Sequence, residues 1–234
     1  MPRRGRIIAQ TGIYHIMLRG NERKEIFLDE EDKSRIIDTI ILKRKDGDFK
    51  LYAFCVMNNH IHVLIKEGKD DIAKVIKRIA TSYAYYYNKK NKRVGHVFQD
   101  RYKSETIKDD RQLLEVIRYI HNNPVKAKIN KKSNEYRWSS YNDYIAKGFS
   151  DKDSDVFHQD LTDILGMFSS IKENAIKLFS EFNKERTEET FIDIDKPEEV
   201  IKEEAKNQII KLCLPIRISK YLQTSCPSKS CQYS

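Results

Sequence analysis

The sequence is poor in cysteine: its 234 residues include four. Cys55 falls inside a predicted strand, while Cys213, Cys226 and Cys231 lie near the C-terminus without a C-x-x-C pair. A zinc site at the last three is therefore only weakly indicated. This cysteine usage is typical of a protein from a reducing compartment.

Long apolar runs are also lacking. No window of the sequence approaches the roughly 18 apolar residues of a membrane-spanning helix. The first ten residues, MPRRGRIIAQ, do not contain the apolar core of a signal peptide. We therefore expect a cytoplasmic protein that does not enter a membrane.

Positive charge is concentrated in the first part of the chain. Residues 1–150 hold 32 Lys and Arg against 19 Asp and Glu, a net charge of +13, while the remaining 84 residues hold 12 against 16, a net charge of −4. A basic front portion favours a polyanion such as nucleic acid as its partner. The alternative is a solvated basic surface that binds nothing.

Strand and helix patterns alternate along residues 13–123. They predict a strand at 13–20, a helix at 28–47, strands at 49–57 and 60–66 joined by an Asn58-Asn59 turn, a helix from 70 or 71 to about 88, a strand at 102–107 and a helix at 109–123. The last helix opens on an Asp cap and is expected to end before Pro124. This order predicts an α+β protein with a ferredoxin-like βαββαβ antiparallel sheet and one added helix.

Three segments are expected along the chain. Residues 1–148 form the domain with the sheet, residues 149–210 an acidic helical extension, and residues 211–234 a poorly packed Ser- and Cys-rich tail. In the extension, TDILGMFSSIKENAIKLFSEFNKE and EEVIKEEAKNQIIKLC both have helical patterns.

Two histidines lie within the third predicted strand, in the stretch MNNHIHVLI. Because side chains alternate on a strand, His60 and His62 share one face, about 6–7 Å apart at the backbone. Their rings can converge on one cation. Two solvated or hydrogen-bonded histidines on an open sheet face are the simpler alternative.

The helix at 109–123 offers further site residues. Tyr119 and Asn123 are neighbours at i, i+4 on the flank of its apolar stripe. Two imidazoles with an amide oxygen suit Mg²⁺ or Mn²⁺, and such an ion polarises a phosphodiester for attack by a nucleophile such as Tyr119. Alternatively, Asn123 only terminates the helix, and Tyr119 is a boundary aromatic.

The stretches NNHIHVLI, GHVFQDRYKSETI and YIHNNPVKAKI together resemble the HUH single-tyrosine transposases of small insertion sequences. YHIMLRGNERKEIF and YRWSSYNDY fit the same family, most closely its REP-associated branch, so the resemblance covers about residues 8–145. It implies an enzyme that cleaves and rejoins single-stranded DNA near hairpins.

The resemblance also assigns roles to residues. It makes His60 and His62 the metal-binding pair and Asn123 the third metal ligand, where many relatives have Gln. It makes Tyr119 the catalytic nucleophile, which forms a 5′-phosphotyrosine link and leaves a free 3′-hydroxyl. The family includes dimers and monomers, so a homodimer is one of two alternatives. The base that activates Tyr119 is not identified; Glu115 and His15 are candidates, with a surface carboxylate and a structural histidine as their simpler interpretations.

Basic residues outside the site are candidates for DNA binding. They form an N-terminal arm, a group after the aromatic segment YAYYY at 83–87, and a pair before the last helix: Arg3, Arg4, Arg6, Lys89, Lys90, Lys92, Arg93, Arg101 and Lys103. The tyrosines of YAYYY either stack on unpaired bases or complete the apolar face of their helix. The arm is either a DNA contact or an unstructured tail.

Two other functions are compatible with the same sequence. One is a nucleic-acid-binding module without chemistry, although the strands lack the aromatic pattern of an RNA-binding sheet. The other is a decayed transposase that still binds DNA hairpins, which the unusual tail leaves open.

Overall fold

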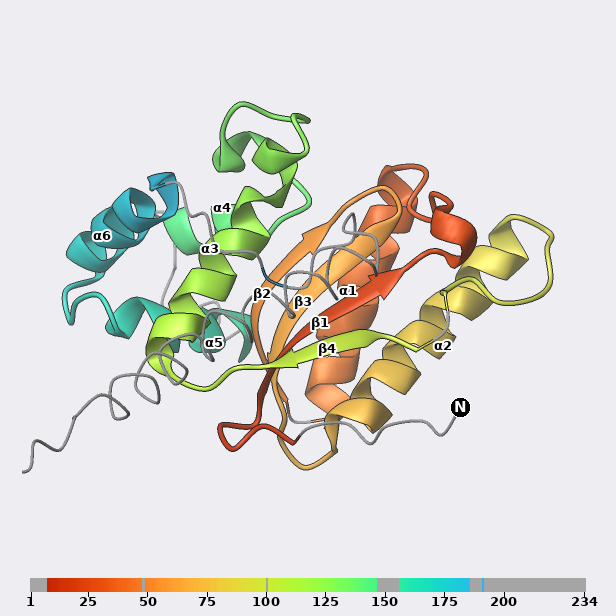
Figure 1. Ribbon diagram of the computed structural model, residues 1–234, viewed down its shortest axis with the longest axis horizontal. Coiled ribbons are helices and arrows are strands. Elements are labelled where there is room, and N and C mark those ends of the chain that lie inside the picture. The colour runs from red at the N-terminus through yellow and green to blue at the C-terminus, as the bar shows by residue number, and fades with distance from the viewer. Residues whose placement is uncertain (1–7, 48, 100, 147–155, 186–190, 192–234) are drawn as a thin grey trace, which may run out of the picture. The chain divides into compact units, whose positions relative to one another are not determined.

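A computed structural model describes residues 8–47, 49–99, 101–146, 156–185 and 191 (Figure 1). Residues up to Ile192 form one compact unit. Its elements begin with β1 (Ile13–Arg19), η1 (Asn21–Arg23), α1 (Glu30–Gly47), β2 (Lys50–Val56), β3 (His60–Lys66), α2 (Ile72–Lys90), β4 (Lys103–Thr106) and α3 (Asp110–Lys126). The predicted order of strands and helices is therefore confirmed.

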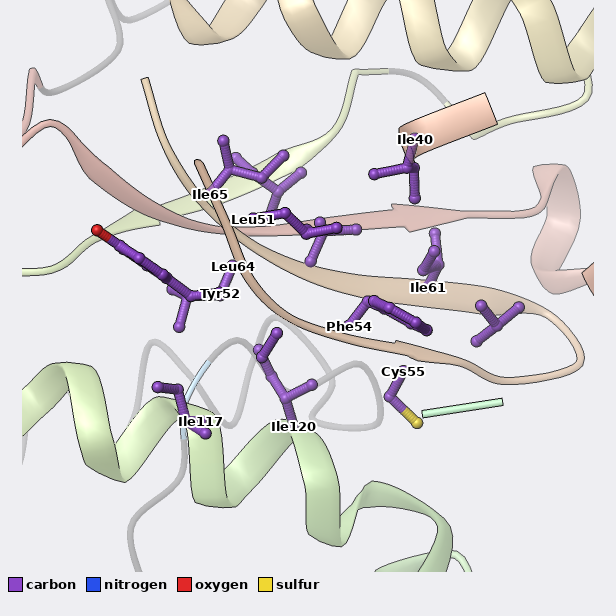
Figure 2. Close-up of a cluster of buried hydrophobic side chains, with 14 of the residues drawn as sticks. Ile40, Leu51, Tyr52, Phe54, Cys55, Ile61, Leu64, Ile65, Ile117 and Ile120 are labelled. Carbon is purple, nitrogen blue, oxygen red and sulfur yellow. The ribbon is translucent and has the colours of Figure 1, made fainter. Parts of the chain in front are cut away.

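The four strands form one antiparallel sheet in the order β2-β3-β1-β4. Helices α1 and α2 cover one face, and α3 packs on the other (Figures 1 and 2). Figure 2 shows Ile40 of α1 on one side of the strands and Ile117 and Ile120 of α3 on the opposite side. This arrangement confirms the predicted ferredoxin-like α+β fold with an added helix.

The two-residue turn Asn58-Asn59 sets the position of β3, the strand that carries His60 and His62. The Met57 N–H donates to the His60 carbonyl at 2.8 Å and closes the β2–β3 hairpin. The Asn59 carbonyl accepts from the N–H of Gly20 at 2.8 Å. A Cβ added to Gly20 would lie 2.2 Å from the Lys24 carbonyl oxygen, so only glycine fits this close approach. The loop after β1 thus holds the turn beside His60.

Helix α3 is longer than the sequence predicts. Asp109 caps its start, because its side chain accepts from the Gln112 N–H. The helix then runs through Pro124 to Lys126, so the predicted end before the proline is wrong by about one turn. Pro124 lies in the last turn, where its missing N–H removes one helical hydrogen bond, and the Ala127 N–H still reaches the Asn123 carbonyl at 2.9 Å.

Further helices follow the sheet. They are η2 (Ser133–Glu135), α4 (Tyr141–Ile145), α5 (Val156–Gly166) and α6 (Lys172–Lys184). The helical pattern predicted over TDILGMFSSIKENAIKLFSEFNKE is broken between α5 and α6. Helix α5 packs on β2 and α6 on α3, so both helices share the core of the sheet domain. The boundary predicted at residue 148 stays a prediction, and the predicted helix at EEVIKEEAKNQIIKLC and the tail at 211–234 lie outside the described residues.

Within the described residues, no helix is long and apolar enough to cross a lipid bilayer.

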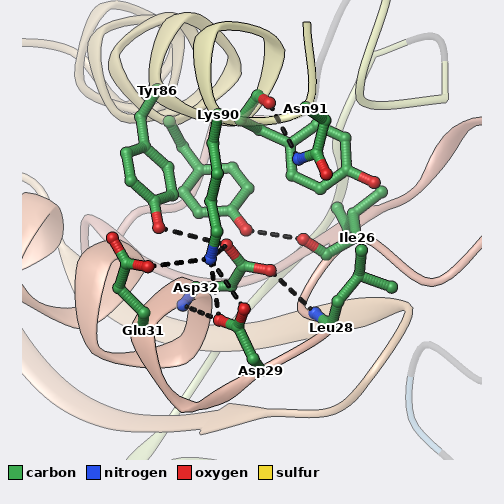
Figure 3. Close-up of polar contacts among 10 residues, drawn as sticks. Ile26, Leu28, Asp29, Glu31, Asp32, Tyr86, Lys90 and Asn91 are labelled. Carbon is green, nitrogen blue, oxygen red and sulfur yellow. Dashed lines mark hydrogen bonds and ion pairs between the residues drawn. The ribbon is translucent and has the colours of Figure 1, made fainter.

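An ionic cluster joins the end of α2 to the start of α1 (Figure 3). The Lys90 ammonium lies 2.7 Å from an Asp29 oxygen, 3.0 Å from Glu31 and 2.9 Å from Asp32, which is fully buried. Tyr86 also donates its hydroxyl hydrogen to Asp32 at 3.1 Å. These carboxylates raise the pKa of Lys90 despite its partial desolvation. The cluster therefore stabilises the helix pair behind the sheet.

We expect Lys90→Met to lower the free energy of unfolding by about 1–2 kcal/mol, because it leaves the buried Asp32 carboxylate without its cation. Urea denaturation measures the change. Lys89→Met, at the exposed neighbouring position, is the control and is expected to change stability by less than about 0.5 kcal/mol. Equal effects of the two substitutions would contradict the structural role of the cluster.

Candidate active site

The sheet face that carries α3 presents the two predicted histidines. Strand register places His62 opposite Met17 of β1 and Cys55 of β2, with Lys103 of β4 opposite Met17 on the other side. Side chains directly opposite one another on neighbouring strands share a face. Lys103, which is exposed, therefore lies on the same face as the histidine pair.

The predicted histidines and tyrosine come together. The ring centroids of His60 and His62 are 5.0 Å apart, with the ring planes nearly perpendicular. Tyr119 projects from α3 so that its ring centroid is 5.7 Å from that of His62. The Tyr119 side chain is 2% exposed. Residues from a strand and from a helix 57 positions later thus form one cluster.

A third histidine joins this cluster. His15 of β1 is fully buried, and its Nε2 is hydrogen-bonded to Nδ1 of His62 at 2.9 Å. Its Nδ1 lies 3.9 Å from a Glu105 carboxylate oxygen on β4, which is longer than a hydrogen bond. The ring of His15 also contacts Tyr119 edge-on, with 5.8 Å between centroids. His15 is therefore a hydrogen-bonded histidine that belongs to the site.

Burial keeps these imidazoles neutral. Desolvation, reinforced by the positive charge of Arg19, lowers the pKa of His60 to about 3. Burial, with His60 and His15 nearby, lowers the pKa of His62 well below its ordinary value. Burial also lowers the pKa of His15, because it outweighs the opposing effect of Glu105. All three rings consequently keep a nitrogen lone pair at neutral pH.

Asn123 lies one turn after Tyr119, but its side chain turns back along the helix. Its Nδ2 donates to the Tyr119 carbonyl at 3.1 Å, and no contact in the described part of the chain joins it to either histidine. Likewise, no group of three or more His, Cys, Asp or Glu side chains within the described ranges is arranged to hold a metal ion. The role of Asn123 as third ligand stays a prediction.

Two residues that the sequence analysis did not single out contact Tyr119. The ring of Phe191 lies 5.3 Å from the Tyr119 ring, and the Lys126 ammonium lies 4.5 Å from its centroid. Lys126 is seven residues after Tyr119 on the same helix, a spacing that predicts a shared face. No local sequence pattern points to Phe191, because it lies 72 positions after Tyr119 in the chain.

Glu115, the other candidate base, is already paired, and His121 belongs to the core. Glu115 accepts a hydrogen bond from Arg111 at 2.9 Å, and its side chain is 13% exposed. His121 is hydrogen-bonded to the Ser140 hydroxyl at 2.9 Å among Tyr141, Tyr144 and Phe179, away from Tyr119. Burial lowers the pKa of His121 to about 3. It is a core histidine.

The predicted DNA-binding residues occupy different positions. Lys89 is exposed on α2, Lys90 is held by three carboxylates, and Arg93 lies over the Tyr87 ring at 5.6 Å. Lys92 adopts a positive φ of 49° just after α2, and Arg101 is exposed before β4. Arg3, Arg4 and Arg6 lie outside the described residues.

In YAYYY, Tyr83 and Tyr87 are buried while Tyr85 is 72% exposed, so most of that segment completes the helix face.

The sheet and the histidine–tyrosine cluster lie within a part of the chain that matches a known family. A family model described as "Transposase IS200 like" matches residues 9–123. These residues include the sheet, the three clustered histidines, Tyr119 and Asn123. This part of the chain belongs to the IS200-like transposase family.

Two individual proteins are similar to this chain. A REP-associated tyrosine transposase of Escherichia coli strain K12 is 25% identical over 148 residues, which cover 62% of this chain and 85% of that protein. A solved structure of a REP-associated tyrosine transposase bound to a REP hairpin matches with a TM-score of 0.55 and 20% identity, covering 64% of this chain and 88% of that one. The structural likeness shows a shared fold.

Proposed function

We propose that this transposase cleaves and rejoins single-stranded DNA near hairpins with the aid of a divalent metal ion, and that Tyr119 is its nucleophile. The observation that carries the proposal is the convergence of His60, His62 and Tyr119 from separate elements, with ring centroids 5.0 and 5.7 Å apart. A hairpin-bound REP-associated relative with the same fold supports hairpin DNA as the substrate.

The hydrogen bonds of the two histidines fit a metal site. Nδ1 of His60 is 2.6 Å from the Asn59 side-chain oxygen, which can only accept, so this nitrogen carries the proton and Nε2 keeps the lone pair. If His62 donates from Nδ1 to His15, its Nε2 is also left as a ligand atom. His15 then directs its own Nδ1–H toward Glu105. Such outer partners orient metal-binding histidines.

Two imidazoles and the Asn123 oxygen form a donor set suited to Mg²⁺ or Mn²⁺. A bound ion would polarise the phosphate to be cleaved. Asn123 would supply its oxygen only after a rotation of its side chain, because its amide nitrogen now donates to the helix backbone.

The proposed cleavage step exchanges a phosphodiester bond of the DNA for a phosphodiester bond to Tyr119. The Tyr119 oxygen attacks phosphorus and loses its proton, the bond from phosphorus to the 3′ oxygen breaks, and that oxygen takes up a proton. The products are a 5′-phosphotyrosine link and a free 3′-hydroxyl. Attack of a 3′-hydroxyl on the link reverses the step, so rejoining needs no nucleotide cofactor. The buried ring of Tyr119 implies that its contact with Phe191 opens when DNA arrives.

The test is formation of a covalent adduct. Purified protein, labelled hairpin DNA from the region flanking its gene, and Mn²⁺ are mixed and then denatured. We expect a protein–DNA adduct that EDTA prevents. His60→Gln should reduce the adduct and Mn²⁺ affinity by about 100-fold or more, because it removes one of the two ring ligands. His96→Gln, at an exposed position, is the control and should behave as the wild type.

A second candidate function is hairpin binding without cleavage. The burial of Tyr119, whose ring contacts Phe191, favours it, because a nucleophile must reach its substrate. Binding of the same DNA with no adduct in Mn²⁺ or Mg²⁺ would support this alternative and contradict the enzyme.

A further inference from the structure

A cavity of about 760 Å³ opens beside α3, on the side of Tyr119 that carries Lys126. Its walls come from the end of α3, the turn around η2, Tyr141 of α4 and the end of α6. A nucleotide fits easily in a cavity of this size. Because Lys126 both lines the cavity and contacts the Tyr119 ring, the cavity begins where the proposed cleavage site ends.

The charge of the cavity favours an anion. Four of its lining residues are lysines, namely Lys126, Lys131, Lys132 and Lys184, and Glu185 is the one carboxylate among them. Glu185 is already paired with Arg118, 3.3 Å away. Lys131, Lys132 and Lys184 form no ion pair within the described residues, and all three are exposed. Their charges are therefore available to a ligand.

The cavity walls are braced against one another. Asn122 of α3 donates from Nδ2 to the Asn183 carbonyl of α6 at 3.0 Å. The Ser133 hydroxyl of η2 donates to the Asn122 side-chain oxygen at 2.6 Å. One asparagine thus joins three elements, so the cavity is formed before any ligand binds. Val125 and Tyr141 add apolar surface to the lining of the cavity.

We propose that this cavity binds a nucleotide of the single-stranded DNA that flanks the hairpin, with the lysines on its phosphates and the apolar wall against its base. Phosphates attract lysines through charge, while bases pack on apolar and aromatic surface whatever their identity. The inference rests on the proposed function and deepens it, because a strand held here would continue from Tyr119 into the cavity.

The experiment compares two labelled DNAs in fluorescence anisotropy. One is a hairpin with randomised single-stranded flanks, and the other is the same stem and loop without flanks. The test variant is Lys131→Gln with Lys132→Gln. The control is Lys45→Gln with Lys77→Gln, two exposed lysines on α1 and α2, which cover the opposite face of the sheet.

We expect the test variant to bind the flanked hairpin about tenfold more weakly than the wild type, with a salt dependence reduced by about 1.4 in log–log slope for two lost phosphate contacts. Its affinity for the flankless hairpin should match that of the control. Equal affinities of the test and control variants for the flanked DNA would overturn the cavity as a strand site.

Adduct formation by the same variant separates this inference from the proposed function. At saturating DNA, the test variant should still form the Tyr119 adduct, because neither lysine belongs to the histidine–tyrosine cluster. A wild type that binds the flanks through these lysines but forms no adduct would contradict the proposed function and leave the cavity supported. If the wild type forms the adduct and the test variant binds the flanked hairpin normally, the proposed function is supported and the cavity is contradicted as a strand site.

Discussion

Replacing Tyr119 with phenylalanine will abolish the covalent adduct while hairpin binding stays within about twofold of the wild type. The substitution removes one oxygen and keeps the ring that packs against His15, His62 and Phe191. The substitution thus removes the nucleophilic oxygen without leaving a cavity in the site. We expect a change in stability of no more than about 1–1.5 kcal/mol, the usual net contribution of one hydrogen bond.

The measurement is adduct yield in Mn²⁺ alongside hairpin affinity and thermal unfolding of each protein. Tyr85→Phe provides the matched control, because Tyr85 is exposed on α2 and lies outside the cluster. An undiminished adduct in Tyr119→Phe would assign the nucleophile to another residue. Loss of binding together with the adduct would instead give Tyr119 a role in holding DNA.

The second large effect concerns folding. Asp160 of α5 and Arg44 of α1 form a buried pair, each 4% exposed in its side chain, with the guanidinium Nε and Nη2 both 2.7 Å from one carboxylate oxygen. The same oxygen accepts from the Leu51 N–H of β2 at 2.8 Å. One carboxylate therefore joins α5 to a helix and a strand that lie more than a hundred residues earlier.

We expect Asp160→Ala to lower the free energy of unfolding by about 3–5 kcal/mol, because it removes the buried carboxylate that pairs with Arg44 and accepts from the Leu51 N–H. Denaturant unfolding measures the loss. Asp163→Ala is the control on the same helix: its partner Lys50 and Asp163 itself are each about half exposed, so less than about 1 kcal/mol should be lost.

The double variant Arg44→Met with Asp160→Leu tests the cause. Removing both charges should restore much of the stability, because the single variant breaks a buried ion pair and leaves one of its two charges in the core. If the double variant is less stable than Asp160→Ala, the ion pair itself contributes to the stability of the fold. A small effect of Asp160→Ala alone would show that α5 is not part of the cooperative unit.

The sheet and its helices could be predicted because each carries a strong local pattern. The Asn58-Asn59 turn, the alternation of HIHVLI and the caps at Asp71 and Asp109 each depend on a few neighbouring residues. The end of α3 was predicted too early, before Pro124. A proline in the last turn removes a single hydrogen bond, so the helix can continue past it.

The convergence of the histidines and Tyr119 followed from strand alternation, helical spacing and family resemblance. The bond from His15 to His62 could not be predicted in this way, because it requires the register of β1 against β3. Phe191 and the pair of Arg44 with Asp160 depend on how distant segments pack, and local sequence patterns do not report this.

Peptide mapping of the trapped adduct identifies the nucleophile of this protein. The wild-type protein is reacted with hairpin DNA and Mn²⁺, digested with protease and nuclease, and analysed by mass spectrometry. The proposed mechanism predicts a nucleotide attached through its 5′ phosphate to the peptide that contains Tyr119, with a free 3′-hydroxyl on the released strand. A nucleotide on any other residue, or a 3′-phosphate link, would contradict it.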